Sequence, residues 1–449
     1  MNSSRIAHAA LVAVLTLAAT GPATVATAET LVLRGGTVHS MVPGAAASVA
    51  DVVVQDGRIV SVGAAAQAPA GARVVDVAGL DVYPGFFDAM STIGLIEISS
   101  IDATVDAAEM PAYNPHLRAA TAIHPDSEVI PVSRSTGITH SLVSPQAGQD
   151  GVIPGQASLV HLDGWTVEEM SIEPSAAMVI AWPQIRTRRF DFSTFTLKES
   201  SYSEAKKEAE EALKALEGWL DAARHYAKAQ AAGSQRTERN LQLEHLAKVL
   251  DGGQRVVILA NAKSDIEAAV EFAEEQGLNM ILAGGRDAWK VTEMLAEKQI
   301  PVILGLVAEL PNQDDHPYDR PFGVAGALRA AGVRIAFGSA VPSGGFGGPD
   351  GPHSARTLPF EAGMATGYGL SREDALRALT VAPAEIFGVA DQLGTIEVGK
   401  RANLVVVEGD PLAIRSAVRH LIVDGKEVEL GTDRHSRLYE RFRSRPTSD

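Results

Sequence analysis

The central part of the chain alternates short apolar runs with longer stretches in which apolar residues recur every three or four positions. Short β-branched runs predict buried strands, and the longer periodic stretches predict amphipathic helices. Strands are predicted near residues 82–88, 138–143, 158–162, 177–182, 255–260, 279–283, 300–305 and 333–338. Strands that alternate with helices are typical of parallel βα units. Eight such units predict an α/β fold, a (β/α)₈ barrel of the TIM type, whose site lies at the carboxyl ends of the strands.

Both ends of the chain carry a different pattern, in which apolar runs are broken by an acidic residue and a glycine. These breaks are Asp56-Gly57, Glu408-Gly409 and Asp424-Gly425. An Asp-Gly pair favours a two-residue hairpin because both of its positions need positive φ. Neither end has enough strands for a stable sheet of its own. We therefore predict one composite β-sandwich domain, formed by residues 29–80 and 391–431, with the barrel inserted as residues 81–390 and a polar tail at 432–449.

Residues 203–231 combine an apolar stripe with oppositely charged residues four positions apart, as in Lys206/Glu210 and Lys207/Glu211. This pattern predicts a long helix that covers the barrel wall and exposes a charged outer face. Residues 341–355 are rich in glycine and proline and follow the last predicted strand. They are interpreted as a loop, either a mobile lid or a plain connection.

The first 28 residues have the pattern of a secretory signal peptide. Arg5 precedes an apolar run, and Ala26-Thr27-Ala28 provides the small residues of a cleavage site. The alternative, a membrane anchor, is weaker because a spanning helix needs ~20 apolar residues. We predict export to the periplasm or the medium and no membrane span.

Composition narrows the classes of partner and of chemistry. The formal charge of −16 disfavours nucleic acids and anionic membranes, which both need a basic surface. The chain has no cysteine, so thiolate metal sites and cysteine nucleophiles are excluded.

Several motifs coincide on one family. The segments "VYPGFFDA", "IAFGSAVP" and "PAEIFGVADQLGTIEVGKRANLVVVEGDPL", followed by "VDGKEV", resemble the metal-dependent amidohydrolase superfamily, in particular its imidazolonepropionase-like secreted branch. The resemblance implies a hydrolase of carbon–nitrogen bonds other than peptide bonds. It also implies one or two metal ions, commonly zinc, at the strand ends, where a metal-bound water attacks an amide or cyclic-amide carbonyl.

The expected metal ligands are replaced in this sequence. The family's His-x-His of strand one falls on Met90 and Thr92, the histidine of strand six on Gly284, and the aspartate of strand eight on Ala340. On strand five, Leu259 and Asn261 lie where a histidine is expected, and the strand-four position is not assigned. Thioethers and neutral hydroxyls bind zinc poorly, and glycine and alanine offer no ligand atom. We therefore expect no metal cofactor and a degenerate site.

Other polar residues near the predicted strand ends are candidates for chemistry or binding. Asp88 is a candidate catalytic group, with a structural acid as the alternative. Candidate oxyanion or substrate contacts are Ser91, Asn261, Arg286 and Ser339, and further candidate acids or bases are Glu97, Glu109, Asp265 and Asp287. For Arg286, a salt bridge with Asp287 or a neighbouring helix is the alternative to ligand binding.

Three functions stay open at this point. The chain can be a hydrolase whose catalytic groups lie at positions other than those of the family. It can also be a non-catalytic pseudoenzyme that binds a small carboxylate or amide, since a guanidinium offers paired donors to such a group. It can also be the partner of an active paralogue in an oligomer. Nothing in the spacing of the residues gives a nucleophile–base pair.

Overall fold

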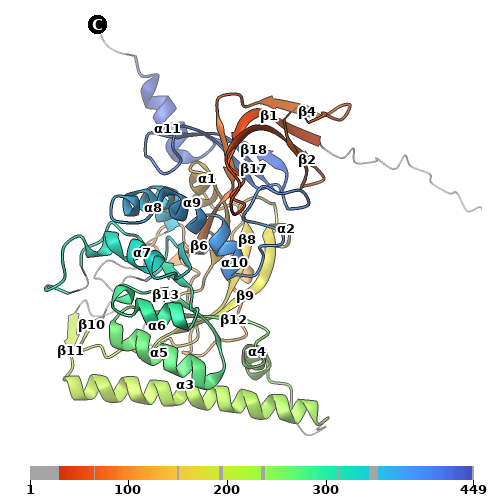
Figure 1. The fold of residues 1–449 in the computed structure, drawn as a ribbon. Helices are drawn as coiled ribbons and strands as arrows, with labels where there is room; N and C mark the ends of the chain where they lie inside the picture. The colour runs from red at the N-terminus through yellow and green to blue at the C-terminus, as the bar shows by residue number, and fades with distance from the viewer. Residues whose placement is uncertain are drawn as a thin grey trace, which may run out of the picture.

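The computed structural model describes residues 30–64, 66–148, 151–191, 196–233, 238–311, 313–342 and 352–446. The predicted signal peptide lies outside the described residues, as does most of the Gly/Pro-rich segment 341–355. Figure 1 shows one sheet, in which the red and blue ends of the chain meet, above a second sheet flanked by helices. Each has eight strands, and they are called the smaller and the larger sheet after the lengths of chain that form them. Among the described residues, no helix is long and apolar enough to cross a bilayer.

The smaller sheet joins the two ends of the chain, as predicted. Its strand order is β18-β17-β16-β5-β1-β2-β3, and β4 pairs with β1. The link between the ends is the antiparallel pairing of β16 with β5. The strands are β1 (Thr30–Val38), β2 (Ser48–Gln55), β3 (Arg58–Gly63), β4 (Arg73–Asp76), β5 (Asp81–Pro84), β16 (Leu404–Glu408), β17 (Ala417–Val423) and β18 (Lys426–Val428). The boundaries of the two domains and the sandwich form of the smaller one stay predictions.

The predicted Asp-Gly turns are confirmed. Asp56 and Gly57 have φ values of 51° and 78°, and Asp424 and Gly425 have 48° and 84°. Each pair connects two neighbouring antiparallel strands, β2 to β3 and β17 to β18. Positive φ at both positions gives a turn whose twist matches that of the flanking strands.

The larger sheet contains eight strands in the order β15-β14-β13-β12-β9-β8-β7-β6. All eight predicted strands have a counterpart in it, and those predicted at 138–143 and 255–260 have the predicted bounds. The strands are β6 (Phe86–Ser91), β7 (Ile138–Val143), β8 (Gly155–His161), β9 (Ser171–Ala181), β12 (Arg255–Ala260), β13 (Asn279–Gly284), β14 (Val302–Leu304) and β15 (Ile335–Phe337).

The expectation of an all-parallel sheet is wrong at one strand. β8 pairs antiparallel with both β7 and β9, whereas the other neighbours are parallel. A parallel neighbour needs a crossover of roughly a dozen residues or more, usually with a helix. The short connection 144–154 shows no helix in its described part, so the chain returns directly and β8 runs the opposite way.

The predicted strand 82–88 is divided between the two sheets at Gly85. A side chain at this glycine would collide with Thr139, since an added Cβ would lie 2.1 Å from its Oγ1. β6 then runs beside the last strand: the backbone N–H of Ala340 donates to the carbonyl of Met90 at 2.9 Å. The first and last strands of the larger sheet therefore contact each other, and the sheet is nearly closed.

Most helices flank the larger sheet, whereas α11 lies apart from it near the C-terminus (Figure 1). The helices are α1 (Val129–Arg134), α2 (Val167–Met170), α3 (Tyr202–Ala231), α4 (Leu241–Leu250), α5 (Lys263–Gln276), α6 (Thr292–Glu297), α7 (Arg320–Ala330), α8 (Leu358–Thr366), α9 (Arg372–Ala378), α10 (Val381–Ile386) and α11 (Arg434–Arg443), with a short hairpin of β10 (Arg188–Asp191) and β11 (Thr196–Glu199). The 3₁₀ turns are η1 (Asp102–Thr104), η2 (Ala119–Thr121), η3 (Ala288–Lys290) and η4 (Pro352–Thr357).

The predicted long helix is α3. It begins with a capping box in which Ser201 and Glu204 bond each other's backbone N–H groups. Its inner face buries Leu216, Leu220 and Ala223, while its outer face is charged. α11 lies in the predicted polar tail and buries no residue.

Candidate functional site

The side chain of Asp88, on β6, forms hydrogen bonds that connect the first strand of the larger sheet to the residues after its last strand. Its carboxylate is fully buried and accepts hydrogen bonds from Ser339 Oγ at 2.5 Å, from the backbone N–H of Ser339 at 2.9 Å and from that of Met90 at 3.3 Å. Burial raises the pKa of Asp88 to about 7, although the bonds from Ser339 and Met90 oppose the shift. These contacts occupy both carboxylate oxygens, which favours the structural interpretation of Asp88.

Ser91 and Asn261, two further candidates, also bond within the protein. Ser91 Oγ lies 2.6 Å from Ser141 Oγ and accepts from the N–H of Ile93 at 3.2 Å. The side-chain amide of Asn261 donates to the carbonyl of Pro342 at 2.9 Å, which ties the end of β12 to the segment after β15. Together with Ser339, both residues hold strand ends together.

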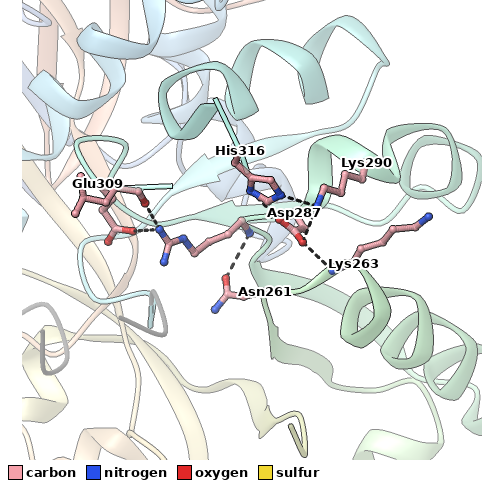
Figure 2. A network of polar contacts seen from close by, with 8 residues as sticks. Asn261, Lys263, Asp287, Lys290, Glu309 and His316 are labelled. Carbon is pink, nitrogen blue, oxygen red and sulfur yellow. Dashed lines mark hydrogen bonds and ion pairs between the residues drawn. The ribbon is translucent and has the colours of Figure 1, made fainter. Parts of the chain in front are cut away.

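Arg286 follows β13, and its guanidinium contacts Glu309 in the loop after β14 (Figure 2). Its Nη2 lies 3.5 Å from Glu309 Oε2 and also donates to the carbonyl of Leu310. The side chains of Arg286 and Glu309 are only 16% and 19% exposed. The guanidinium that the sequence suggested for ligand binding is therefore in an ion pair, with Glu309 as the partner.

Asp287 forms a second network beside Arg286 (Figure 2). Its buried carboxylate lies 3.2 Å from Lys290 Nζ and accepts from the N–H of Lys263 at 3.3 Å. Lys290 Nζ lies 2.8 Å from His316 Nε2. Because an ammonium can only donate, His316 accepts this hydrogen bond at Nε2. Sequence reasoning had named Asp287 but missed Lys290 and His316. The Asp287/Lys290 spacing of three was a usable signal, whereas the loop position of His316 gave none.

A pocket opens where β12, β13, β14 and β15 end. It is open to solvent, and its empty space of about 540 Å³ includes part of that solvent. Its charged lining residues are Arg286, Glu309 and Arg320, and its apolar lining includes Leu304 and Val324. Arg320, at the start of α7, was not singled out by sequence reasoning, because the pattern gives no sign that α7 begins at the mouth of the sheet.

Comparisons with known proteins agree with the motifs and the two-sheet architecture. A family model described as "Amidohydrolase family" matches residues 209–429. A solved structure of an amidohydrolase from Thermotoga maritima MSB8 is similar to 89% of this chain over its whole length, with a TM-score of 0.74 and 27% identity. The chain belongs to the metal-dependent amidohydrolase superfamily.

Two curated relatives extend this result. Amidohydrolase tasK of Hapsidospora irregularis is 26% identical over 403 residues, which are 84% of this chain and 39% of that protein. N-substituted formamide deformylase of Arthrobacter pascens is 28% identical over 166 residues, which are 36% of this chain and 30% of that protein. The chain thus spans well under half the length of the curated amidohydrolase relatives it matches.

The amidohydrolase metal does not fit the residues at the expected ligand positions. Gly284 has a φ of 102°, and a Cβ added there would lie 2.6 Å from Asn261 Oδ1 and 2.9 Å from the carbonyl of Ala260. No side chain, and therefore no imidazole, fits on this backbone. Met90 and Thr92 are buried, and Ala340 offers no ligand atom. Within the described residues, no three His, Cys, Asp or Glu side chains are grouped so that they could hold a metal ion.

The other candidates lie apart from the pocket lining. Glu109 is exposed, Asp265 lies in the first turn of α5 with its pKa raised by burial, and Glu97 Oε1 is buried without a partner among the described residues. Two histidines also lie outside the pocket lining. His140 is buried in a stack with Phe87, with ring centroids 5.5 Å apart, and His353 is exposed.

Proposed function

We propose that this chain is an exported amidohydrolase-family protein with a degenerate, metal-free site. The site binds a small carboxylate or amide and does not catalyse the hydrolysis of amide bonds. The observation that carries the proposal is the set of hydrogen bonds that hold the buried carboxylate of Asp88. The acid that the family motif retains is fully buried and bonded to Ser339 and Met90, so it is not aimed at a substrate. The proposal places this site in a (β/α)₈-type barrel whose nearly closed sheet has an antiparallel third strand.

The internal hydrogen bonds of the mouth support a loss of hydrolysis. Oxyanion stabilisation requires donors directed at the reacting carbonyl. Instead, the Asn261 amide donates to the Pro342 carbonyl and the Ser339 hydroxyl donates to Asp88. Each of these two donors would have to break its internal hydrogen bond before it could donate to a substrate.

Two alternatives remain as candidate functions. The names of the curated relatives, an amidohydrolase and a formamide deformylase, favour hydrolysis of an amide-type bond. The other alternative, the partner of an active paralogue, rests on an intact scaffold whose expected ligand positions carry Met90, Thr92, Gly284 and Ala340. Export, from the pattern of residues 1–28, is part of the proposal in each case.

Turnover assays on the mature protein test the proposal. We expect no hydrolysis above the buffer rate of a cyclic amide, a dipeptide or an N-substituted formamide, with or without added zinc, because the positions expected to hold the metal carry no suitable ligand side chain. The N-substituted formamide deformylase serves as the positive control. Turnover that Asp88→Asn abolishes would contradict the proposal and favour a hydrolase.

A further inference from the structure

We infer that Arg320 is the anchor of a carboxylate-binding site in the pocket where β12–β15 end, and that the site takes a compact, apolar monocarboxylate. This inference rests on the proposed function, since it identifies the ligand class and the residue that would recognise it. It replaces Arg286, which the sequence suggested, with a residue from α7.

The charges of the pocket lining leave one cation unmatched. The lining holds two arginines and one glutamate, and the glutamate, Glu309, pairs with Arg286 at 3.5 Å. Behind the lining, the Asp287 carboxylate pairs with Lys290, which also donates to His316, and the buried Glu361 carboxylate accepts from the N–H groups of Val307 and Ala308. Among the lining residues themselves, the guanidinium of Arg320 is the one charge for which no ion pair is found in the described part of the chain.

Arg320 is held in place without using its hydrogen-bonding groups. Its guanidinium carbon lies 4.3 Å from the centroid of the Trp289 ring. Within the described part of the chain, its buried Nε has no hydrogen-bond partner, and no ion pair to its guanidinium is found. Stacking on an aromatic face orients a guanidinium and leaves its edge available for a planar anion.

Trp289 is itself braced by His316 in an edge-to-face contact, with centroids 5.7 Å apart. The cation is therefore fixed in position before any ligand arrives, which reduces the ordering cost of binding.

The apolar lining specifies the rest of the ligand. Leu304, Val324 and Val341 contribute aliphatic walls, and Pro311, Pro321 and Pro342 add rigid ones. One unmatched charge and aliphatic walls together fit a monocarboxylate with a compact hydrocarbon body better than a phosphate dianion.

Calorimetric titration of the mature protein tests the site. The probes are cyclohexanecarboxylate, benzoate and N-acetyl-L-proline, with cyclohexanecarboxamide as the uncharged match and inorganic phosphate as the dianion. We expect at least one carboxylate to bind, and the amide and phosphate to bind at least about ten-fold more weakly. Loss of a charged hydrogen bond predicts that Arg320→Gln weakens carboxylate binding about ten- to a hundred-fold.

Matched variants keep the result interpretable. Arg437→Gln removes the same charge from the exposed helix α11, and it should leave the affinity unchanged. Arg320→Lys keeps the charge but loses the planar fork, so it should retain part of the affinity, and it provides a second reading if Arg320→Gln folds poorly. Wild-type affinity in both Arg320 variants, equal binding of acid and amide, tighter binding of phosphate, or binding of none of the carboxylates would overturn the site.

Turnover and metal content, measured on the same samples, distinguish a failure of the Arg320 site from a failure of the proposed function. Carboxylate binding through Arg320 in a protein that also turns over an amide would contradict the proposed function and support the site. A protein without turnover that binds none of the carboxylates would contradict the site alone.

Discussion

At the level of single residues, the structure assigns to Asp88 a role that its motif does not reveal. The family motif places an acid at the end of the first strand of the larger sheet, and the sequence left catalysis and structure as alternatives. The decisive contacts come from Ser339, 251 positions away, which the sequence could not pair with Asp88. The same holds for Arg320, whose stacking on Trp289 joins the start of α7 to the 3₁₀ turn η3.

The buried Asp88 predicts a specific dependence of stability on pH. Its pKa is raised from 3.8 to about 7, so the folded state holds a proton that the unfolded chain has released between these values. The free energy of unfolding that depends on this group is therefore fully present below pH 3.8 and is lost as the pH rises through about 7. The loss is on the order of a few kcal/mol, since one pKa unit corresponds to about 1.4 kcal/mol.

Asp88→Asn isolates this contribution. An amide mimics the protonated acid, because it can donate to Ser339 Oγ while still accepting from the two backbone N–H groups. Urea unfolding should show the variant close to wild type near pH 4 and more stable than wild type near pH 8. Two stability profiles that run parallel from pH 4 to 8 would mean that Asp88 does not titrate as described.

At the level of elements, the apolar pattern located the strands better than it oriented them. Residues 138–143 and 255–260 were predicted with their observed bounds because both strands are almost completely buried between turns. The direction of β8 was not predictable in this way. A strand buried on both faces has the same composition whether its neighbours are parallel or antiparallel, so only the missing crossover helix distinguishes the two.

The pairing of β16 with β5 predicts the effect of removing the C-terminal strands. Deleting residues 394–430 would remove β16, β17 and β18 and leave the apolar strands of the N-terminal end without partners. We expect an insoluble chain, because a few unpaired strands are at best marginal in water. Deleting residues 434–449 is the matched control, since α11 buries no residue, and it should leave a soluble, cooperatively folding protein. Cooperative unfolding of the first truncation would show that the N-terminal strands fold without those of the C-terminal end.

At the level of the whole molecule, the amidohydrolase architecture is present while the positions expected to hold its metal are closed. Sequence motifs were sufficient for the family and for the shared terminal sheet, because both depend on local patterns and turn residues. They were insufficient for the pocket, which forms where four strand ends and α7 converge. The replacement of the ligands could be read from the sequence, but the lack of space at Gly284 could not, because it depends on Asn261 from the neighbouring strand.

The most direct test of the central claim, a metal-free amidohydrolase fold, is elemental analysis of the purified mature protein by mass spectrometry after exposure to zinc and removal of excess ion. The account predicts far less than one equivalent of zinc per chain, and a thermal midpoint that a chelator leaves unchanged, because only a ligand bound to the native state shifts that midpoint. One or two equivalents of zinc, with a midpoint that falls on chelation, would contradict it.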